Sequence, residues 1–214
     1  MVFEHFFEDS PTVYIVDDEP LVRVSLIDLF DSLKLKAVGY ESADEFLSEA
    51  DLRQHGCILL DVFMPGTNGL DLQSQLALAG NTMPIVFMTG RGTVPMSVQA
   101  MKAGATDFLL KPFENGAVIA ATFAAIRRDA ERRQFVAACE QIRQAAASLT
   151  PREREVMKYV GDGLMNKQIA YEMKISEMMV KLHRGRMMRK MQAGSLAELV
   201  KKLDLVATEF DIYQ

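Results

Sequence analysis

The first half of the chain alternates short apolar runs with longer amphipathic stretches. The apolar runs are Thr12–Val16, Lys36–Gly39, Cys57–Leu60, Pro84–Met88 and Phe108–Leu110. The stretches of helical length include Leu21–Leu33, Leu70–Ala79 and Val94–Ala103. Apolar strands between helices indicate βαβ units, and hence a parallel sheet covered on both faces. Residues 1–125 are therefore predicted to form a doubly wound five-stranded parallel (βα)5 domain, an α/β fold that binds ligands beyond the carboxyl ends of its strands.

After Pro112 the pattern becomes purely helical and predicts one helix over Glu114–Leu149. Apolar residues recur in it at intervals of 4, 3, 4 and 3, at Phe135, Cys139, Ile142, Ala146 and Leu149. Charges of both signs precede this stripe, at Arg127, Arg128, Asp129, Glu131, Arg132 and Arg133. So short a stripe favours a packed helix that joins two domains, with a coiled coil as the alternative. We expect residues 126–148 to be this linker helix.

Residues 149–214 are predicted to be an all-α domain of four helices. The expected helices are 151–160, Asn166–Met173, Glu177–Met191 and Ser195–Leu205. Thr150 and Glu153 form a capping box at the start of the first helix. Only a short turn separates the second helix from the third. This is a helix-turn-helix arrangement, in which the third helix is the candidate reader of DNA.

The third helix of this domain has two different faces. At about 100° per residue, Val180, Met187 and Met191 share one stripe, which we expect to be buried. The opposite face carries Met178, Lys181, Leu182, Gly185, Arg186 and Arg189. Residues 181–190 hold five Lys and Arg side chains and no acid. This pattern favours nucleic-acid binding over the alternative, a solvated surface.

Charge divides the chain in the same way. The 214 residues hold 24 Lys and Arg against 29 Asp and Glu, a net charge of −5. Residues 1–125 hold 7 basic and 17 acidic side chains, a net of −10, whereas residues 126–214 hold 17 and 12, a net of +5. Opposite signs indicate two domains with different partners, a cation for the acidic part and a polyanion for the basic part.

Several classes of protein conflict with the sequence. No apolar run reaches the ~18 residues that span a bilayer, and the first residues are acidic where a signal peptide is basic. Cys57 and Cys139 are the two cysteines, and no CxxC or HExxH spacing occurs. A disulfide scaffold and a structural zinc site are therefore not expected. We expect a soluble cytoplasmic protein without a membrane partner.

Polar side chains stand where the predicted strands end. In chain order they are Asp17-Asp18-Glu19, Asp61, Thr89-Gly90 and Lys111-Pro112. Parallel strands end at one edge of a sheet, so these groups should converge there. Clustered carboxylates repel unless a cation or a lysine neutralises them, and Mg²⁺ suits such a site. The alternative is that each is a solvated charge at a strand end.

These residues carry a resemblance to the receiver domains of two-component response regulators. The matching strings are Val-Asp-Asp-Glu at 16–19, Leu-Asp-Val-Phe-Met-Pro-Gly-Thr-Asn-Gly-Leu-Asp at 60–71, Phe-Met-Thr-Gly at 87–90, Met-Lys-Ala-Gly-Ala-Thr-Asp-Phe-Leu at 101–109 and Lys-Pro-Phe at 111–113. The resemblance covers nearly all of residues 10–125.

The resemblance implies that Asp61 is the phosphoacceptor. Asp18, Asp61 and the backbone carbonyl of Phe63 would bind Mg²⁺, and Asp17 would support the ion through solvent. Lys111 would contact the phosphoryl oxygens. An aspartate attacks a phosphoryl group only where the charge on that group is neutralised, which Mg²⁺ and an ammonium both do.

The resemblance also implies a switch made of Thr89 and Phe108. A phosphoryl oxygen would draw the Thr89 hydroxyl inward, and the Phe108 ring would rotate into the vacated space. Because Phe lacks the hydroxyl of Tyr, packing alone would govern this rotation. The alternative for Phe108 is an ordinary core aromatic. The peptide bond before Pro112 is expected to be cis.

Residues 149–203 resemble the LuxR-type helix-turn-helix, close to the FixJ-like branch. The matching strings include Leu-Thr-Pro-Arg-Glu-Arg-Glu-Val at 149–156, Gly-Leu-Met-Asn-Lys-Gln-Ile-Ala at 163–170 and Val-Lys-Leu-His-Arg-Gly-Arg at 180–186. The DNA contacts that we assign are Asn166, Lys167, Lys181, Leu182, Gly185, Arg186 and Arg189. The resemblance places Lys181, Leu182 and Gly185 on base edges, and Lys167 with the other basic residues on phosphates. The family usually has Thr where this chain has Met179, so a hydroxyl contact to phosphate is missing.

We therefore predict a two-component response regulator that acts as a DNA-binding transcription regulator and not as an enzyme. Activation is the commoner outcome in the branch that it resembles. The expected partners are a sensor histidine kinase, promoter DNA, a second copy of the chain after phosphorylation, and RNA polymerase if the protein is an activator. The second copy is expected to bind through residues 94–103 and 107–110.

Two other functions remain open from the sequence. One is a DNA-binding adaptor that does not depend on phosphorylation. The other is an aspartate-nucleophile phosphohydrolase, whose nucleophile would normally stand first in an Asp-x-Asp string after the first strand. At the N-terminus, Phe3, Phe6 and Phe7 are expected to add a turn or short helix that buries at least one ring, with a disordered tail as the alternative.

Overall fold

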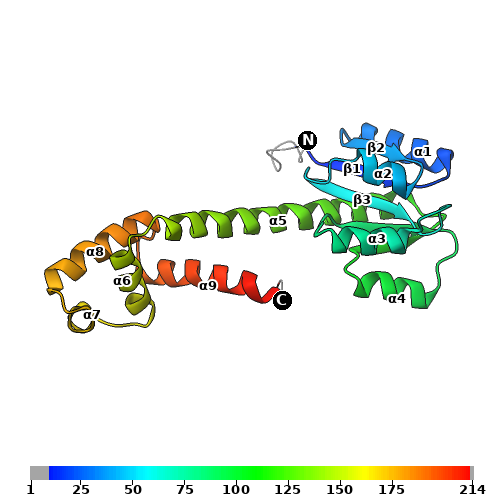
Figure 1. Ribbon diagram of the computed structural model, residues 1–214. Coiled ribbons are helices and arrows are strands. Elements are labelled where there is room, and N and C mark those ends of the chain that lie inside the picture. Colours follow the sequence, from blue (N-terminus) through cyan, green and yellow to red (C-terminus); the bar gives the residue numbers. More distant parts are fainter. Residues whose placement is uncertain (1–9, 213–214) are drawn as a thin grey trace. The chain divides into compact units, whose positions relative to one another are not determined.

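The first part of the chain is a five-stranded parallel sheet with helices on both faces (Figure 1). The computed structural model describes the backbone of residues 10–212 and the side chains of residues 10–206. The strands are β1 (Thr12–Val16), β2 (Lys36–Tyr40), β3 (Gly56–Asp61), β4 (Ile85–Thr89) and β5 (Asp107–Leu110). They lie in the order β2-β1-β3-β4-β5, and every pairing is parallel. The predicted doubly wound α/β fold is confirmed.

Five helices belong to this domain in whole or in part. They are α1 (Pro20–Ser32), α2 (Ala43–Glu49), α3 (Gly69–Leu78), α4 (Val94–Lys102) and α5 (Asn115–Ala147). Alternate residues of the central strands enter two separate cores. The α2, α3 and α4 side includes Ile58 and Phe87, and the α1 and α5 side includes Ile15 and Val86. Because β1, β3 and β4 are buried on both faces, they read as unbroken apolar runs.

A buried carboxylate joins α5 to the edge of the sheet where β3 begins, opposite the carboxyl ends of the strands. Asp129 of α5 is fully buried. Its Oδ2 accepts a hydrogen bond from the Gly56 backbone N–H at 3.1 Å and lies 2.8 Å from His55 Nδ1. Its Oδ1 accepts a bond from Arg132 Nη2 at 2.7 Å. The start of β3 and the middle of α5 are thus joined by a charged, hydrogen-bonded contact.

The second part of the chain is entirely helical. Contacts divide the chain into units 1–132 and 133–214, so α5 contributes residues to both. The remaining helices are α6 (Pro151–Gly161), α7 (Asn166–Met173), α8 (Glu177–Lys190) and α9 (Leu196–Ile212). The four predicted helices are confirmed, α9 running beyond the expected end. A capping box between Thr150 and Glu153 starts α6.

The core of the helical unit explains the apolar stripe of α5. Cys139 and Leu149 are buried, and Ile142 and Ala146 pack against the core of α6 to α9. The stripe therefore packs within the protein, as a domain-joining helix requires. The expected N-terminal turn at Phe3, Phe6 and Phe7 lies outside the described residues. No helix among residues 10–212 combines the length and hydrophobicity that crossing a membrane requires.

Candidate functional site

The carboxyl edge of the sheet brings two carboxylates and an ammonium together. Asp17 follows β1, Asp61 ends β3, and Lys111 follows β5. Lys111 Nζ lies 2.7 Å from Asp17 Oδ2 and 3.4 Å from Asp61 Oδ2. Both carboxylates are buried, and Asp61 Oδ1 accepts no hydrogen bond within the described part of the chain. This oxygen therefore has lone pairs available to coordinate a cation or to attack an electrophile.

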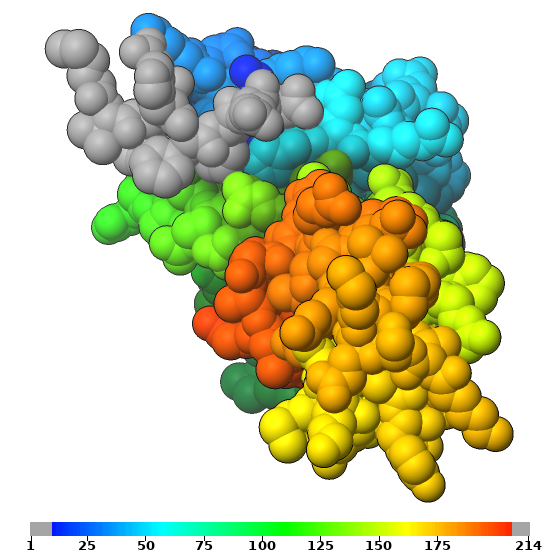
Figure 2. All heavy atoms as spheres, turned by 90° about the vertical axis from the view of Figure 1, so that its left-hand side faces the viewer, coloured from blue at the N-terminus to red at the C-terminus, as the bar shows by residue number. Residues whose placement is uncertain are grey.

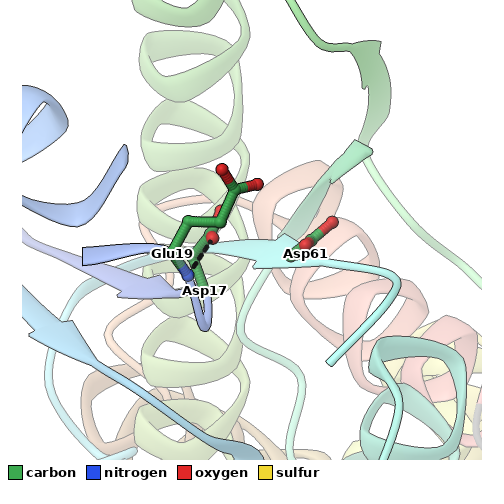
Figure 3. A group of neighbouring side chains, drawn as sticks. All are labelled: Asp17, Glu19 and Asp61. Atoms are coloured by element: carbon green, nitrogen blue, oxygen red, sulfur yellow. Dashed lines mark hydrogen bonds between the residues drawn. The ribbon is translucent and has the colours of Figure 1, made fainter. Parts of the chain in front are cut away.

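A third carboxylate completes the cluster, and it belongs to Glu19 (Figure 3). One ligand oxygen from each of Asp17, Glu19 and Asp61 lies within 4.8 Å of the others. Glu19 Oε1 is 3.3 Å from Lys111 Nζ, and the Glu19 backbone N–H donates to Asp17 Oδ1 at 3.0 Å. Asp18, which we predicted as a metal ligand, is not in this group. Its assignment stays a prediction.

Burial and charge oppose one another in this cluster. Burial raises the pKa of Asp17 and of Asp61 above the usual range, although the Lys111 ammonium acts against it. Burial alone would lower the pKa of Lys111, but its hydrogen bond to Asp17 and the surrounding carboxylates outweigh that effect and raise the pKa. One ammonium is shared among three carboxylates. The donor set therefore suits a hard divalent cation such as Mg²⁺, which prefers oxygen ligands.

The loop after β3 depends on a glycine to approach the site. A Cβ on Gly69 would lie 2.2 Å from the Asp61 carbonyl oxygen, a distance that no side chain tolerates. The Gly69 backbone N–H donates to the Val62 carbonyl at 3.0 Å, which holds the start of α3 close to Asp61. Phe63, two residues after Asp61, has a side chain that is about half exposed.

The two predicted switch residues lie in neighbouring strands, under a glycine. Thr89 is fully buried, and its Oγ1 accepts a hydrogen bond from the Arg91 N–H at 3.2 Å. The partly buried Phe108 ring lies 6.1 Å from the Phe87 ring, centroid to centroid. A Cβ on Gly92 would lie 2.9 Å from the Phe108 ring and 3.0 Å from the Thr89 methyl carbon. The loop after β4 therefore packs directly on both switch residues.

A groove of about 490 Å³ adjoins the cluster. It runs along α1 and the segment after β5, and its lining includes Glu19, Leu21, Gly90 and Lys111. A Cβ on Gly90 would meet nothing within 4 Å. Through this groove, Glu19 and Lys111 are open to a ligand from outside. The Lys111–Pro112 peptide bond in its wall is cis, as the resemblance implied.

In the helical unit, α8 presents the face that the sequence pattern indicated. Val180, Met187 and Met191 are buried in the core, as predicted. Of the seven residues assigned to DNA, six are exposed: Lys167, Lys181, Leu182, Gly185, Arg186 and Arg189. The helix begins at a Ser176 cap, whose Oγ accepts the Met179 N–H at 3.3 Å. Its first turn is thus fixed with its side chains in solvent.

Two of the five cations at 181–190 bind within the protein. Arg184 Nη1 donates to Asn166 Oδ1 at 2.9 Å, so that Asn166, the seventh assigned residue, joins α7 to α8. Lys190 Nζ donates to Glu153 Oε2 at 2.7 Å and to the Ser148 carbonyl at 2.9 Å. The Lys190 hydrogen bond, together with that from the Thr150 N–H, lowers the pKa of Glu153 to about 2. The Lys190 ammonium therefore binds groups of its own domain.

Comparison with known proteins accounts for both units. Residues 13–123 match the response regulator receiver domain, and residues 147–203 match the bacterial regulatory proteins of the luxR family. The chain belongs to the response regulators with a LuxR-type DNA-binding domain. In this family a receiver domain takes its signal from a histidine kinase, and the LuxR-type domain binds DNA.

Individual response regulators match over almost the whole chain. It is 44% identical to Nodulation protein W of Bradyrhizobium diazoefficiens over 88% of this chain and 83% of that protein. It is 42% identical to the transcriptional regulatory protein FixJ of Azorhizobium caulinodans, over 90% and 92%. The structure of the response regulator StyR superposes with a TM-score of 0.83 at 44% identity, covering 91% of this chain and 98% of StyR.

Sequence reasoning on this response regulator missed two features of the site and one contact at the opposite edge of the sheet. Glu19 was noted at a strand end but was not assigned to the cluster. Gly92 follows the recognisable Thr89-Gly90 pair, and a second glycine two residues later is the signal that a close approach occurs there. The contact from Asp129 to His55 joins residues 74 positions apart, and no local pattern marks it.

Proposed function

We propose that this response regulator accepts a phosphoryl group on Asp61 from a sensor histidine kinase and then regulates transcription from promoter DNA. Residues 1–125 would receive the signal, residues 126–148 would link, and residues 149–214 would bind DNA. One observation carries the proposal. The Asp61 carboxylate has one oxygen facing the Lys111 ammonium and one oxygen without a hydrogen bond, in a chain that also carries a LuxR-type domain.

The chemistry at Asp61 is an exchange of one phosphorus bond for another. A carboxylate oxygen of Asp61 forms the new bond to phosphorus, and the bond from phosphorus to the kinase histidine nitrogen breaks. Lys111 stays beside the Asp61 carboxylate and offsets the negative charge of the arriving group. Mg²⁺ bound at this edge would neutralise phosphoryl oxygens. Asp61, Asp18, Asp17 and the Phe63 carbonyl are its predicted ligands, with Glu19 in reach.

Thr89 and Phe108 would carry the signal away from Asp61. The Thr89 oxygen already accepts the Arg91 N–H, so its own O–H is left to donate to a phosphoryl oxygen. Movement of Thr89 toward that oxygen would open space for the Phe108 ring, which belongs to β5, is only partly buried and contacts the loop before α4. The surface formed by α4 and β5 would then change shape.

That surface is the proposed contact between two copies. Val94, Val98 and Met101 of α4 and Leu110 of β5 are exposed apolar side chains. Two copies would place two α8 helices on neighbouring half-sites, which adds the base contacts that one short helix lacks. Activation through RNA polymerase would follow from DNA binding, as in the branch that the chain resembles.

Intact mass after treatment with acetyl phosphate and Mg²⁺ tests the proposal. We expect one added phosphoryl group on the unaltered chain and none on Asp61→Asn, with light scattering showing a dimer only for the phosphorylated chain. A phosphoryl group added to Asp61→Asn would mean that another residue is the acceptor. If the phosphorylated chain stays a monomer and still binds DNA more tightly, the mechanism is release of an inhibitory contact and not dimerisation.

A further inference from the structure

A continuous ridge of α8 points away from the core of the DNA-binding domain. Met178, Leu182, Gly185 and Arg189 follow one another at intervals of four, three and four residues, which places them on one side of a helix. The buried stripe through Val180 lies on the opposite side. The ridge begins at the N-terminal end of α8, and that end faces the viewer in Figure 2 as gold atoms.

The first half of the ridge is apolar although it lies in solvent. The Met178 side chain is 82% exposed and Leu182 is 43% exposed. Met179, beside them, is 41% exposed. Removing an apolar side chain of this size from water lowers the free energy. A group of such side chains on a surface therefore marks a binding site for another molecule. These side chains have no role in the core of the domain, so their partner must come from outside.

The surroundings of the apolar group identify that partner as DNA. Lys181 and Arg186 are exposed on either side of the ridge, and Arg189 continues it. Cations placed in this way attract a polyanion such as DNA, whereas an apolar protein partner would leave their charges to be desolvated. The N-terminal residues of the second helix of a helix-turn-helix are those that reach base edges.

We propose that Met178, together with Leu182, reads the 5-methyl group of thymine in the major groove. This inference rests on the proposed DNA binding and adds a residue and a ligand chemistry to it. Neither side chain donates a strong hydrogen bond, so neither can read the oxygens and nitrogens of a base edge. The thymine methyl is the apolar group that a base pair presents in the major groove. Methionine is long and unbranched, and it adapts to such a contact.

The expected effect follows from the size of one methyl group. Burying it contributes ~0.8 kcal/mol, which is roughly a fourfold change in the dissociation constant at each half-site. Deoxyuridine lacks this methyl group and keeps every hydrogen-bonding atom of thymine. Replacing one thymine by deoxyuridine therefore isolates the proposed contact.

The test uses the full chain, treated with acetyl phosphate, and duplexes that it selects from a randomised DNA pool. Each thymine of a selected duplex is replaced in turn by deoxyuridine. The unaltered chain should bind two of these deoxyuridine duplexes roughly fourfold more weakly than the parent duplex. One of them lacks the thymine methyl that Met178 contacts, and the other lacks the one that Leu182 contacts. Met178→Ala should abolish the difference at its own thymine. The control Lys167→Ala, at a residue expected on phosphate, should weaken binding to the thymine and deoxyuridine duplexes alike and keep their ratio.

Three results would overturn the inference, and each would contradict a different part of it. If no duplex is enriched, the proposed DNA binding fails and this inference with it. If duplexes are enriched but every deoxyuridine duplex binds as tightly as its parent, DNA binding stands and methyl reading falls. If Met178→Ala keeps the full ratio at every thymine while its circular dichroism spectrum is unchanged, Met178 is not a reading residue.

Discussion

Replacing Asp129 by alanine should destabilise the receiver domain strongly, although Asp129 contacts the edge of the sheet opposite to Asp61. The substitution removes the acceptor of three groups: the Gly56 N–H, His55 Nδ1 and Arg132 Nη2. The His55 side chain is 8% exposed and that of Arg132 is 30% exposed. Arg132 can therefore turn to water, whereas the other two donors lose an acceptor in the interior.

The magnitude follows from those two donors. A buried donor that loses its partner costs ~1–3 kcal/mol, which gives roughly 2–6 kcal/mol for the pair. The middle of that range is about 4 kcal/mol. With a urea m-value of ~2 kcal/mol per molar, the midpoint of the receiver transition should fall by ~2 M.

Hydrogen exchange at increasing urea concentration measures this effect in the intact chain. Peptides from β1 and β3 report unfolding of the receiver domain, and peptides from α6 and α8 serve as an internal reference. Glu131→Ala is the matched control, because Glu131 lies on the same helix in a solvent-exposed pair with Arg127 at 4.0 Å. Such pairs contribute ~0–1 kcal/mol.

Equal shifts for Asp129→Ala and Glu131→Ala would refute the reasoning. That outcome would mean that the buried contact contributes no more than an exposed one. A fall in the midpoint of the α6 and α8 peptides as large as that of β1 and β3 would also count against it, since the loss would then not be confined to the receiver domain.

Three further predictions concern the metal, acid stability and DNA. Asp18→Ala should weaken Mg²⁺ binding in a calorimetric titration, while an unchanged titration, with a loss in Glu19→Ala instead, would transfer the ligand role to Glu19. The pKa of Glu153 lies at about 2 against an ordinary 4.5, so the stability that its carboxylate contributes is present above about pH 4.5 and is lost as pH falls to about 2. Thermal melts of Glu153→Gln should lack this pH dependence. Melting temperatures of the variant that follow the same pH profile as the unaltered chain would contradict the prediction. Lys181→Ala should reduce discrimination between DNA sites by ~1–3 kcal/mol, whereas Lys167→Ala should weaken all sites alike; the reverse pattern in competition binding would exchange their roles.

The sheet and the convergence at its edge could be predicted because both follow from local patterns. An unbroken apolar run bounded by helices indicates a buried parallel strand, and the carboxyl ends of such strands meet at one edge. Asp61 and Lys111 could be placed together on this ground alone, 50 residues apart in the chain. The same holds for Val180 and Met187, whose helical period predicts their burial.

Contacts made outside regular elements could not be predicted in this way. β1 ends at Val16 and α1 begins at Pro20, so the alternation of a strand no longer decides which of Asp18 and Glu19 faces the site. Lys190 ends a helix rich in cations, and its sequence context resembles that of Arg189. Only the packing of α6 against α8 shows that Lys190 meets the buried Glu153 carboxylate instead of solvent.

The exposure of Met178 makes the proposed contact with thymine sensitive to oxidants. Peroxide converts an accessible thioether to a polar sulfoxide, a change that methionine sulfoxide reductases reverse. Met187 and Met191 are shielded in the core, so the fold should survive a dose that alters Met178. Lysine and arginine side chains are unaffected by this chemistry. Aged or peroxide-treated protein should therefore keep its attraction for DNA while losing its preference for thymine, and the reductase should restore that preference.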